Sequence, residues 1–173
     1  NPTSEVFNRA QVRRRRERAN AGYHQADFLK KRVLEDISDR LASTGRKFDR
    51  ALCLGGYNTQ TKEILGPFYG DVIETDFAQG RVGQGGIVAD EEWLPFKDES
   101  FDLVVSPLAL HWVNDLPGSL IQINRAMKPD GFFVGVLAGG ASFTELRQSL
   151  LRAESELTGG AEMRVSPFAD AAD

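Results

Sequence analysis

Apolar residues along this chain follow two kinds of pattern. Short, mostly apolar runs predict buried β-strands, and they lie at 51–54, 71–75, 86–90, 101–105 and 132–137. Longer segments carry apolar side chains at helical spacing, and they lie at 28–41, 116–127 and 142–157, with a shorter helix suited to 59–65. Strands that alternate with helices in this way are typical of a parallel sheet covered by helices on both faces.

Polar residues mark the starts of these predicted helices. Asp27 can cap the first helix, and Asn114 or Asp115 can cap the helix that begins at 116. Ser142 and Glu145 have the spacing of a capping box. Stretches rich in glycine or proline, which favour turns, stops or loops, follow three of the elements, at 66–67, 78–86 and 128–131.

The composition is that of a soluble globular domain. The chain has 173 residues, enough for one domain with a buried core. No apolar run approaches the roughly 20 residues that a membrane-spanning helix needs. The single cysteine, Cys53, excludes an internal disulfide, and no cysteine and histidine cluster predicts a metal site. A reducing compartment fits best.

The net charge of −4 hides an asymmetry between the two parts of the chain. Residues 1–50 carry 13 Lys and Arg against 7 Asp and Glu, a balance of +6, whereas residues 51–173 carry 8 against 18, a balance of −10. The basic excess centres on RRRRER, residues 13–18. This run is either an arm for an acidic partner or nucleic acid, or a solvated helix face. The solvated face is favoured, and no nucleic-acid partner is expected.

Ligands of parallel α/β sheets bind beyond the carboxyl ends of the strands, so the residues that follow each strand are the site candidates. Gly55 and Gly56 follow the first predicted strand. They either let a ligand approach the backbone or form a plain tight turn. Asp76 follows the second strand, where a carboxylate can accept hydrogen bonds from two ribose hydroxyls. The alternative for Asp76 is a helix cap or a solvated acid.

The later strand ends add further candidates. Phe77 can stack on an adenine ring or belong to the core. Asp90 can accept a hydrogen bond from an exocyclic amine, although it begins a run of three acids that can instead be solvated surface. His111 is a candidate base or substrate contact, or a packing residue beside Trp112. No triad order or metal-ligand spacing is present, and Cys53 is predicted to be a small buried side chain.

Four motifs between residues 88 and 133 together indicate a family: an acid before LPF, then FDLVVS, LHWVNDLP and KPDG. The segment that carries them resembles the class I S-adenosylmethionine-dependent methyltransferases. It is similar to the branch of malonyl-carrier-protein methyltransferases and, closer still, to the mitochondrial assembly factors for respiratory complex I and their bacterial relatives. FNRAQVRRRRERA and GGAEMRVSPFAD also resemble the closer branch, so the similarity covers most of residues 5–173.

The resemblance implies a Rossmann-like three-layer α/β sandwich with a mostly parallel sheet, which binds S-adenosylmethionine. It also implies a role for each matching residue: Asp76 holds the ribose, Phe77 lies beside the adenine, Asp90 meets the adenine amino group, Glu91 offers its backbone N–H, Gly55 passes under the methionine part, and Ser106 flanks the methyl group. His111 is the candidate for a catalytic base.

The first loop departs from the family pattern of acid-x-Gly-x-Gly-x-Gly. Cys53 stands in place of the acid, and Tyr57 and Thr59 replace the second and third glycines. Gly55 is kept, and Gly56 occupies a variable position that still lies in the predicted cofactor loop. A tyrosine side chain at position 57 is expected to fill space beside the methionine end of the cofactor.

The resemblance also implies a longer natural protein, because two further strands and much of a substrate lid would follow residue 173. The sheet of this chain is therefore expected to stop after its fifth strand. The expected division is a basic helical segment at 1–45, the S-adenosylmethionine-binding domain at 46–158, and the start of a lid at 159–173.

Three functions are compatible with these features. The first is methyl transfer from S-adenosylmethionine to a small-molecule or protein acceptor. The second is a cofactor-binding assembly factor for the respiratory NADH dehydrogenase, which hydroxylates an arginine of a partner subunit. The third is a non-catalytic interaction module with an eroded cofactor loop. A nicotinamide dehydrogenase is disfavoured because no G-x-G-x-x-G follows the first strand. The expected location is a bacterial cytoplasm or the mitochondrial matrix.

Overall fold

A computed structural model describes residues 5–56, 59–160 and 162–170 of the chain. Its centre is a five-stranded sheet in the order β3-β2-β1-β4-β5, in which every neighbouring pair is parallel. The strands are β1 (Phe48–Leu54), β2 (Tyr69–Asp76), β3 (Ile87–Val88), β4 (Phe101–Pro107) and β5 (Met127–Val136). Each run that was predicted to be a strand therefore contributes to one sheet.

Five α-helices accompany the strands in the described residues. They are α1 (Arg9–Ala19), α2 (Phe28–Thr44), α3 (Thr59–Leu65), α4 (Leu116–Ala126) and α5 (Thr144–Thr158). Short 3-10 turns lie at η1 (Asn20–Gln25), η2 (Gly66–Phe68), η3 (Gln79–Arg81) and η4 (Leu110–Trp112). The glycine-rich stretch after β2 holds only the single turn η3, so a loop connects β2 to β3, as predicted.

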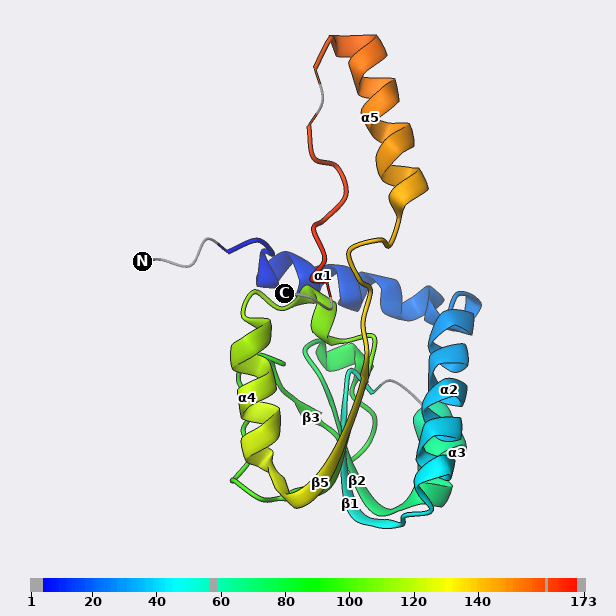
Figure 1. Ribbon diagram of the computed structural model, residues 1–173, viewed down its shortest axis with the longest axis vertical. Coiled ribbons are helices and arrows are strands. Elements are labelled where there is room, and N and C mark those ends of the chain that lie inside the picture. The colour runs from blue at the N-terminus through cyan, green and yellow to red at the C-terminus, as the bar shows by residue number, and fades with distance from the viewer. Residues whose placement is uncertain (1–4, 57–58, 161, 171–173) are drawn as a thin grey trace. The chain divides into compact units, whose positions relative to one another are not determined.

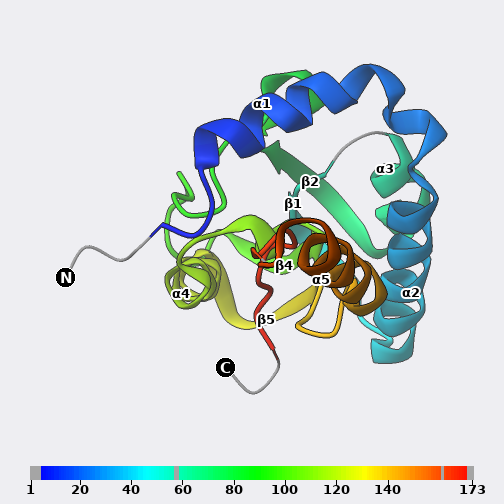
Figure 2. The same ribbon diagram turned by 90° about the horizontal axis from the view of Figure 1, so that it is seen from above.

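The two faces of the sheet are covered by different helices, with α2 and α3 on one face and α4 on the other (Figures 1 and 2). Side chains of β1 alternate between these layers, because successive residues of a strand point to opposite faces. Ala51 and Cys53 pack with α2 and α3, while Leu52 and Leu54 pack with α4. The predicted three-layer α/β sandwich is confirmed.

The chain separates into two compact units, Asn1–Leu137 and Ala138–Asp173. The first unit contains the sheet and helices α1 to α4. The second contains α5 and the segment after it, where Arg164 Nε donates a hydrogen bond to Glu154 Oε1 over 2.6 Å. The division at residues 45 and 158 stays a prediction.

The helix caps agree with the sequence at one of three predicted positions. Asp115 caps α4, since its Oδ1 accepts a hydrogen bond from Gly118 N over 2.8 Å. Asp27 precedes α2, but its carboxylate does not cap the helix and instead accepts a hydrogen bond from Gln60 Nε2. The predicted capping box of Ser142 and Glu145 is wrong.

The chain enters α5 through Phe143, which has a left-handed backbone with φ of 60°. The left-handed residue, rather than Ser142, therefore occupies the position before the helix, and no side chain caps it. The predicted stop at 128–131 is only half correct: it ends α4, but these residues already belong to β5. There Asp130 has φ of 65° and the pairing with β4 shifts register.

Candidate functional site

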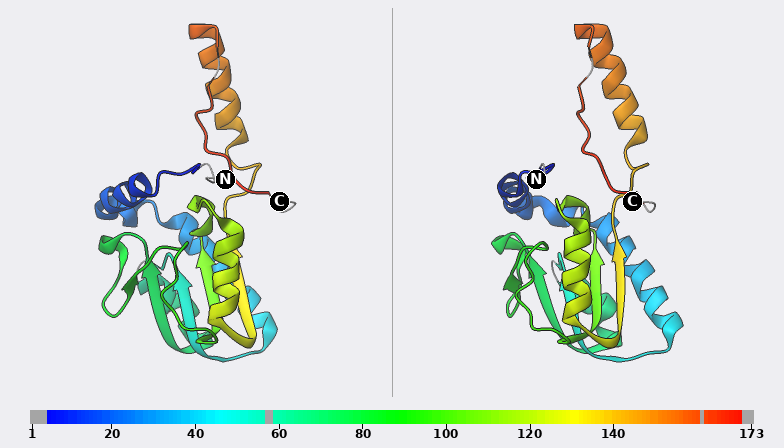
Figure 3. Two further views of the ribbon diagram at one scale, coloured as in Figure 1. Left: turned by 90° about the vertical axis from the view of Figure 1, so that its left-hand side faces the viewer. Right: turned by 60° about the vertical axis from the view of Figure 1, so that its left-hand side comes forward.

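The predicted site residues gather at the carboxyl ends of the strands, where α1 also lies (Figure 3). Gly55 follows β1 with φ of 67°, and a Cβ atom built on it would lie 2.8 Å from Ala109 Cβ. Only glycine fits this conformation and this close approach without strain. The backbone N–H groups of Gly55 and Gly56 both donate to Thr75 O, over 2.8 and 3.1 Å. These glycines therefore build a tight turn against the end of β2.

Asp76 ends β2 with a side chain that is 2% exposed. Its Oδ1 accepts a hydrogen bond from Ala78 N over 2.8 Å and lies 3.4 Å from Arg16 Nη1. The backbone bond is the local turn that short acids commonly make. The contact with Arg16 joins this carboxylate to a residue sixty positions earlier in the chain.

A second arginine of α1 binds the acids that follow β3. Arg9 Nη2 forms ion pairs with Asp90 Oδ1 and with Glu91 Oε2, the latter over 2.5 Å. Arg16 Nη1 binds the other oxygen of Glu91 over 2.7 Å. Burial by itself would raise the pKa of Glu91, but Arg16 and Arg9 outweigh it and hold that pKa below its ordinary value. Glu91 is thus ionised and held by two guanidinium groups, which the sequence did not indicate.

Phe77 lies beneath the guanidinium group of Arg9. The guanidinium carbon of Arg9 lies over the Phe77 ring, 4.4 Å from its centroid, and Arg9 Nη1 also donates to Trp112 O over 2.9 Å. The favoured interpretation of the basic run as a solvated face holds for Arg14 and Arg18, which are exposed, and is wrong for Arg16. Arg9 and Arg16 are seven residues apart, which is about two turns of a helix, so they lie on one face of α1. This spacing is the one signal in the sequence that the two arginines act together.

The start of α1 is also fixed to the loop after β4. Phe7 N donates to Asn114 Oδ1 over 2.7 Å, and Asn114 Nδ2 donates to Phe7 O over 3.0 Å. The Phe7 ring meets Trp112 edge to face, with 5.5 Å between ring centroids. Asn114 is therefore an anchor for the N-terminal segment, while Asp115 caps α4.

His111 lies in η4, with its ring centroid 5.2 Å from that of Trp112. Burial, and then the positive charge of Arg16, lower the pKa of His111 to about 4. The imidazole is therefore neutral at neutral pH. A base with so low a pKa abstracts protons weakly, so the catalytic role of His111 stays a prediction.

Ser106 and Cys53 lie inside the sheet. The Ser106 side chain is fully buried in β4, and its hydroxyl has no hydrogen-bond partner within the described part of the chain. Burial raises the pKa of the Cys53 thiol to about 12, which confirms a buried, unreactive side chain. Tyr57 lies outside the described residues.

Lys30, which sequence reasoning missed, reaches this region from α2. Its side chain is 5% exposed, and its Nζ donates to Gly55 O. Burial lowers the pKa of Lys30 to about 8. A lysine in an otherwise amphipathic helix gives no local signal of such burial.

The cavity between these elements is small. It measures about 130 Å³, and its lining includes Arg16, Tyr23, Lys30, Gly55, Asp76 and Trp112. Ligand sites are commonly about 300 to 1,000 Å³. Arg16 is the residue of α1 that lines this cavity.

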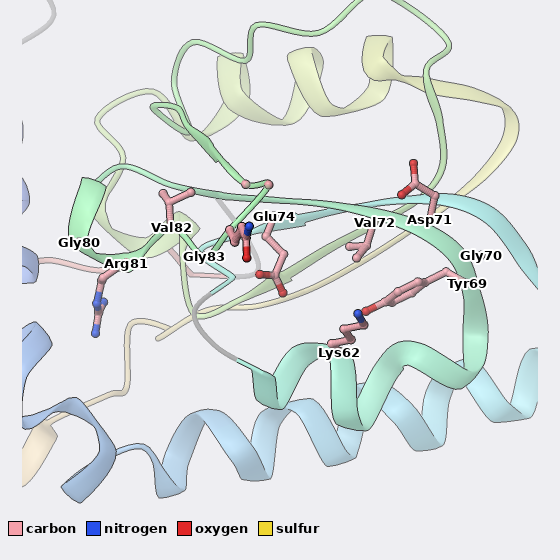
Figure 4. Close-up of a pocket in the computed structure, with 13 residues that line it drawn as sticks. Lys62, Tyr69, Gly70, Asp71, Val72, Glu74, Gly80, Arg81, Val82 and Gly83 are labelled. Carbon is pink, nitrogen blue, oxygen red and sulfur yellow. The ribbon is translucent and has the colours of Figure 1, made fainter.

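A larger cavity of about 680 Å³ lies between β2, α3 and the glycine-rich loop that precedes β3 (Figure 4). Lys62, Tyr69 and Glu74 line it together with the loop, and none of the predicted site residues does. Glu74 Oε1 and the Tyr69 hydroxyl are buried and have no hydrogen-bond partner among the residues that the structure describes. Burial raises the pKa of both groups.

Across the described ranges, no three His, Cys, Asp or Glu side chains are grouped so that they could hold a metal ion. Among the same residues, no helix is both long and apolar enough to cross a membrane.

Comparison with known proteins shows what this chain is similar to. The family model of a methyltransferase domain matches residues 52–135, from β1 to β5. The human protein named arginine-hydroxylase NDUFAF5, mitochondrial, is 46% identical over 151 residues, which cover 82% of this chain and 44% of that protein. Residues 52–135 of the chain form a methyltransferase domain. This domain carries Gly55, Asp76, Asp90 and His111, whereas α1 lies outside the match.

Other relatives agree with this assignment. The malonyl-[acyl-carrier protein] O-methyltransferase of Geobacter sulfurreducens is 30% identical over 176 residues, covering 94% of this chain and 66% of that protein. In fold, the chain matches a Thermotoga maritima structure titled as a SAM-dependent methyltransferase, possible histamine N-methyltransferase. The TM-score is 0.59 at 19% identity, covering 91% of this chain and 74% of that one. The chain spans about half the length of the NDUFAF5 proteins that it matches over most of its own length.

Proposed function

We propose that this chain binds S-adenosylmethionine at the carboxyl ends of β1, β2 and β3 and acts as a methyltransferase. The observation that carries the proposal is the position of the Arg9 guanidinium. It is a flat group that lies over Phe77 and donates an N–H to Asp90. Adenine needs the same two partners, a ring to stack on and an acceptor for its amino group.

The remaining contacts fit the rest of the nucleoside. Asp76 accepts from Arg16 in this structure, and a carboxylate that accepts an N–H also accepts ribose hydroxyls. Gly55 has no side chain to obstruct a ligand that passes along the backbone. When bound, S-adenosylmethionine supplies an activated methyl group. The chain's own residues then bind and orient it, and orientation is the main catalytic contribution in such a transfer.

Calorimetric titration with S-adenosylhomocysteine, the demethylated product, tests the proposal. Asp90→Asn keeps the shape of the side chain but removes its charge, and we expect about a tenfold weaker affinity from the loss of one charge-assisted bond. Asp98→Asn is the matched control, because Asp98 is an exposed acid that pairs with Arg125. Equal affinities of the two variants would contradict the site. Absence of binding to the wild-type protein would support a non-catalytic interaction module instead.

A second function is supported by the 46% identity to the human arginine-hydroxylase. In this alternative the chain binds the cofactor in the mitochondrial matrix and hydroxylates an arginine of a subunit of the respiratory NADH dehydrogenase. Mass spectrometry of a partner subunit incubated with the protein separates the two. Methyl transfer adds one CH₂ unit and depends on S-adenosylmethionine. Hydroxylation adds one oxygen atom and depends on an added oxidant, such as dioxygen together with a two-electron reductant.

A further inference from the structure

The two arginines that hold the acids stand apart from the others of α1. Arg9 and Arg16 have side chains that are 13% and 10% exposed. Arg14 and Arg18, on the same helix, are exposed. The helix is therefore oriented so that Arg9 and Arg16 enter the site, while Arg14 and Arg18 face water. Arg13 lies between Arg9 and Arg16 in the chain, with its guanidinium carbon 5.8 Å from the centroid of the Phe77 ring.

These contacts leave no room for the nucleoside of the proposed function. The Arg9 guanidinium lies 4.4 Å from the centroid of the Phe77 ring, which is stacking distance, so an adenine on that ring would occupy the same volume. The same group binds Asp90, and Arg16 lies against Asp76. Arginine and nucleoside thus share three partners and cannot use them together.

The contacts that hold α1 in place are polar or at its margins, and the ion pairs are prominent among them. No residue of α1 is buried, so this helix contributes no core packing of its own. Arg9 also donates to Trp112 O, and the guanidinium carbon of Arg13 lies 5.8 Å from the centroid of the Phe77 ring. At the two ends of the helix, Phe7 meets Asn114, and Glu17 and Asn20 meet the backbone of Gly80. A segment held by polar contacts with little apolar burial opens at low free-energy cost.

Glu91 explains why the closed arrangement is nevertheless stable. Its carboxylate is 2% exposed and is bound by both arginines. A buried carboxylate without a cation is costly, so the acids retain α1 while no ligand competes. The acids that would bind the nucleoside are therefore also the docking site of the helix.

We infer that Arg9 and Arg16 close the cofactor site and set its affinity, and that α1 withdraws from Phe77, Asp90 and Asp76 when the nucleoside enters. The inference rests on the proposed function. Because the ligand binds only the open form, the measured dissociation constant exceeds the intrinsic one by the inverse of the open fraction. Removal of the two arginines should therefore tighten binding.

The test is calorimetry with S-adenosylhomocysteine on three proteins: the wild type, Arg9→Ala/Arg16→Ala, and Arg14→Ala/Arg18→Ala. With an open fraction of about 10% in the wild type, the first variant should bind about tenfold more tightly. The control variant loses the same charge from the exposed face and should bind like the wild type. Circular dichroism checks that each variant is folded.

Other results of the titrations would overturn either the inference or the proposed function. Weaker or unchanged binding by folded Arg9→Ala/Arg16→Ala would overturn the inference, because the arginines would then support the ligand or not meet it. Equal tightening by the control variant would also overturn it, since net charge would be the cause. If no protein binds, the proposed function itself fails. Hydrogen exchange of amides 9–19 gives a second readout, with faster exchange expected when S-adenosylhomocysteine is present.

Discussion

Lys30 offers a quantitative test of the structure, because its buried ammonium should lower stability at neutral pH. Burial lowers the pKa of Lys30 from 10.5 to about 8. At about 1.36 kcal/mol for each pKa unit, the charged form costs about 3 kcal/mol of folding free energy at pH 7. The substitution Lys30→Met removes that cost and keeps an apolar stem of similar length. It also removes the hydrogen bond to Gly55 O, which contributes about 1 kcal/mol. The net expectation is a gain of about 2 kcal/mol at pH 7.

The stability gained by Lys30→Met should depend on pH. Because the folded pKa of Lys30 is depressed, the folded protein binds fewer protons than the unfolded chain between pH 8 and pH 10.5. The wild-type protein therefore regains stability as pH rises through this window, and the remaining cost is about 1 kcal/mol at pH 9.5. The advantage of Lys30→Met should shrink from about 2 kcal/mol at pH 7 to about zero at pH 9.5.

Urea unfolding at both pH values measures these differences. Lys31→Met is the control for net charge, because Lys31 is the exposed neighbour in the same helix. A difference between Lys30→Met and the wild type that is the same at pH 7 and pH 9.5 would refute the reasoning. So would a variant that is less stable than the wild type at pH 7.

Three further predictions concern single groups. Gly55→Ala should lower the free energy of unfolding by about 3 kcal/mol, since the substitution combines a positive φ with a Cβ clash, whereas Gly66→Ala meets nothing within 4 Å; similar urea midpoints for the two would contradict this. Burial and then the charge of Arg16 lower the pKa of His111 to about 4, so Arg16→Ala should raise this pKa but leave it below 6.5, because the burial remains; NMR titration of the imidazole measures it, and an unmoved pKa would show that Arg16 has no such effect. Glu74→Gln should raise the free energy of unfolding at pH 7 but not at pH 4, because burial raises the pKa of Glu74 and penalises only its charged form. Urea unfolding measures this difference, and an equal gain at both pH values would contradict that cause.

The sheet and its order of elements could be predicted because both depend on patterns within short segments. Central strands such as β1 and β4 are buried on both faces and therefore read as continuous apolar runs. Parallel strands end at one edge of a sheet, which is why Asp76 and Asp90, predicted separately, lie in one region. One arginine, Arg9, contacts Asp90, and the other, Arg16, contacts Asp76.

The contacts between the arginines of α1 and the acids after the strands could not be predicted in the same way. Arg9 and Glu91 are 82 positions apart, and no local pattern records which distant charge a surface arginine will meet. The capping box failed for a related reason. Ser142 and Glu145 satisfy a local rule, but the backbone at Phe143 adopts a left-handed conformation that places the start of α5 elsewhere.

The central claim is that a nucleoside lies over Phe77 in the place that the Arg9 guanidinium takes in this structure. The most direct test is NMR of the protein with S-adenosylhomocysteine, observing nuclear Overhauser effects between the adenine protons and selectively labelled phenylalanine rings, with a Phe77→Leu variant to assign the signal. We expect contacts from adenine to the Phe77 ring. Binding that gives contacts instead to Tyr69, in the larger cavity of Figure 4, would contradict it.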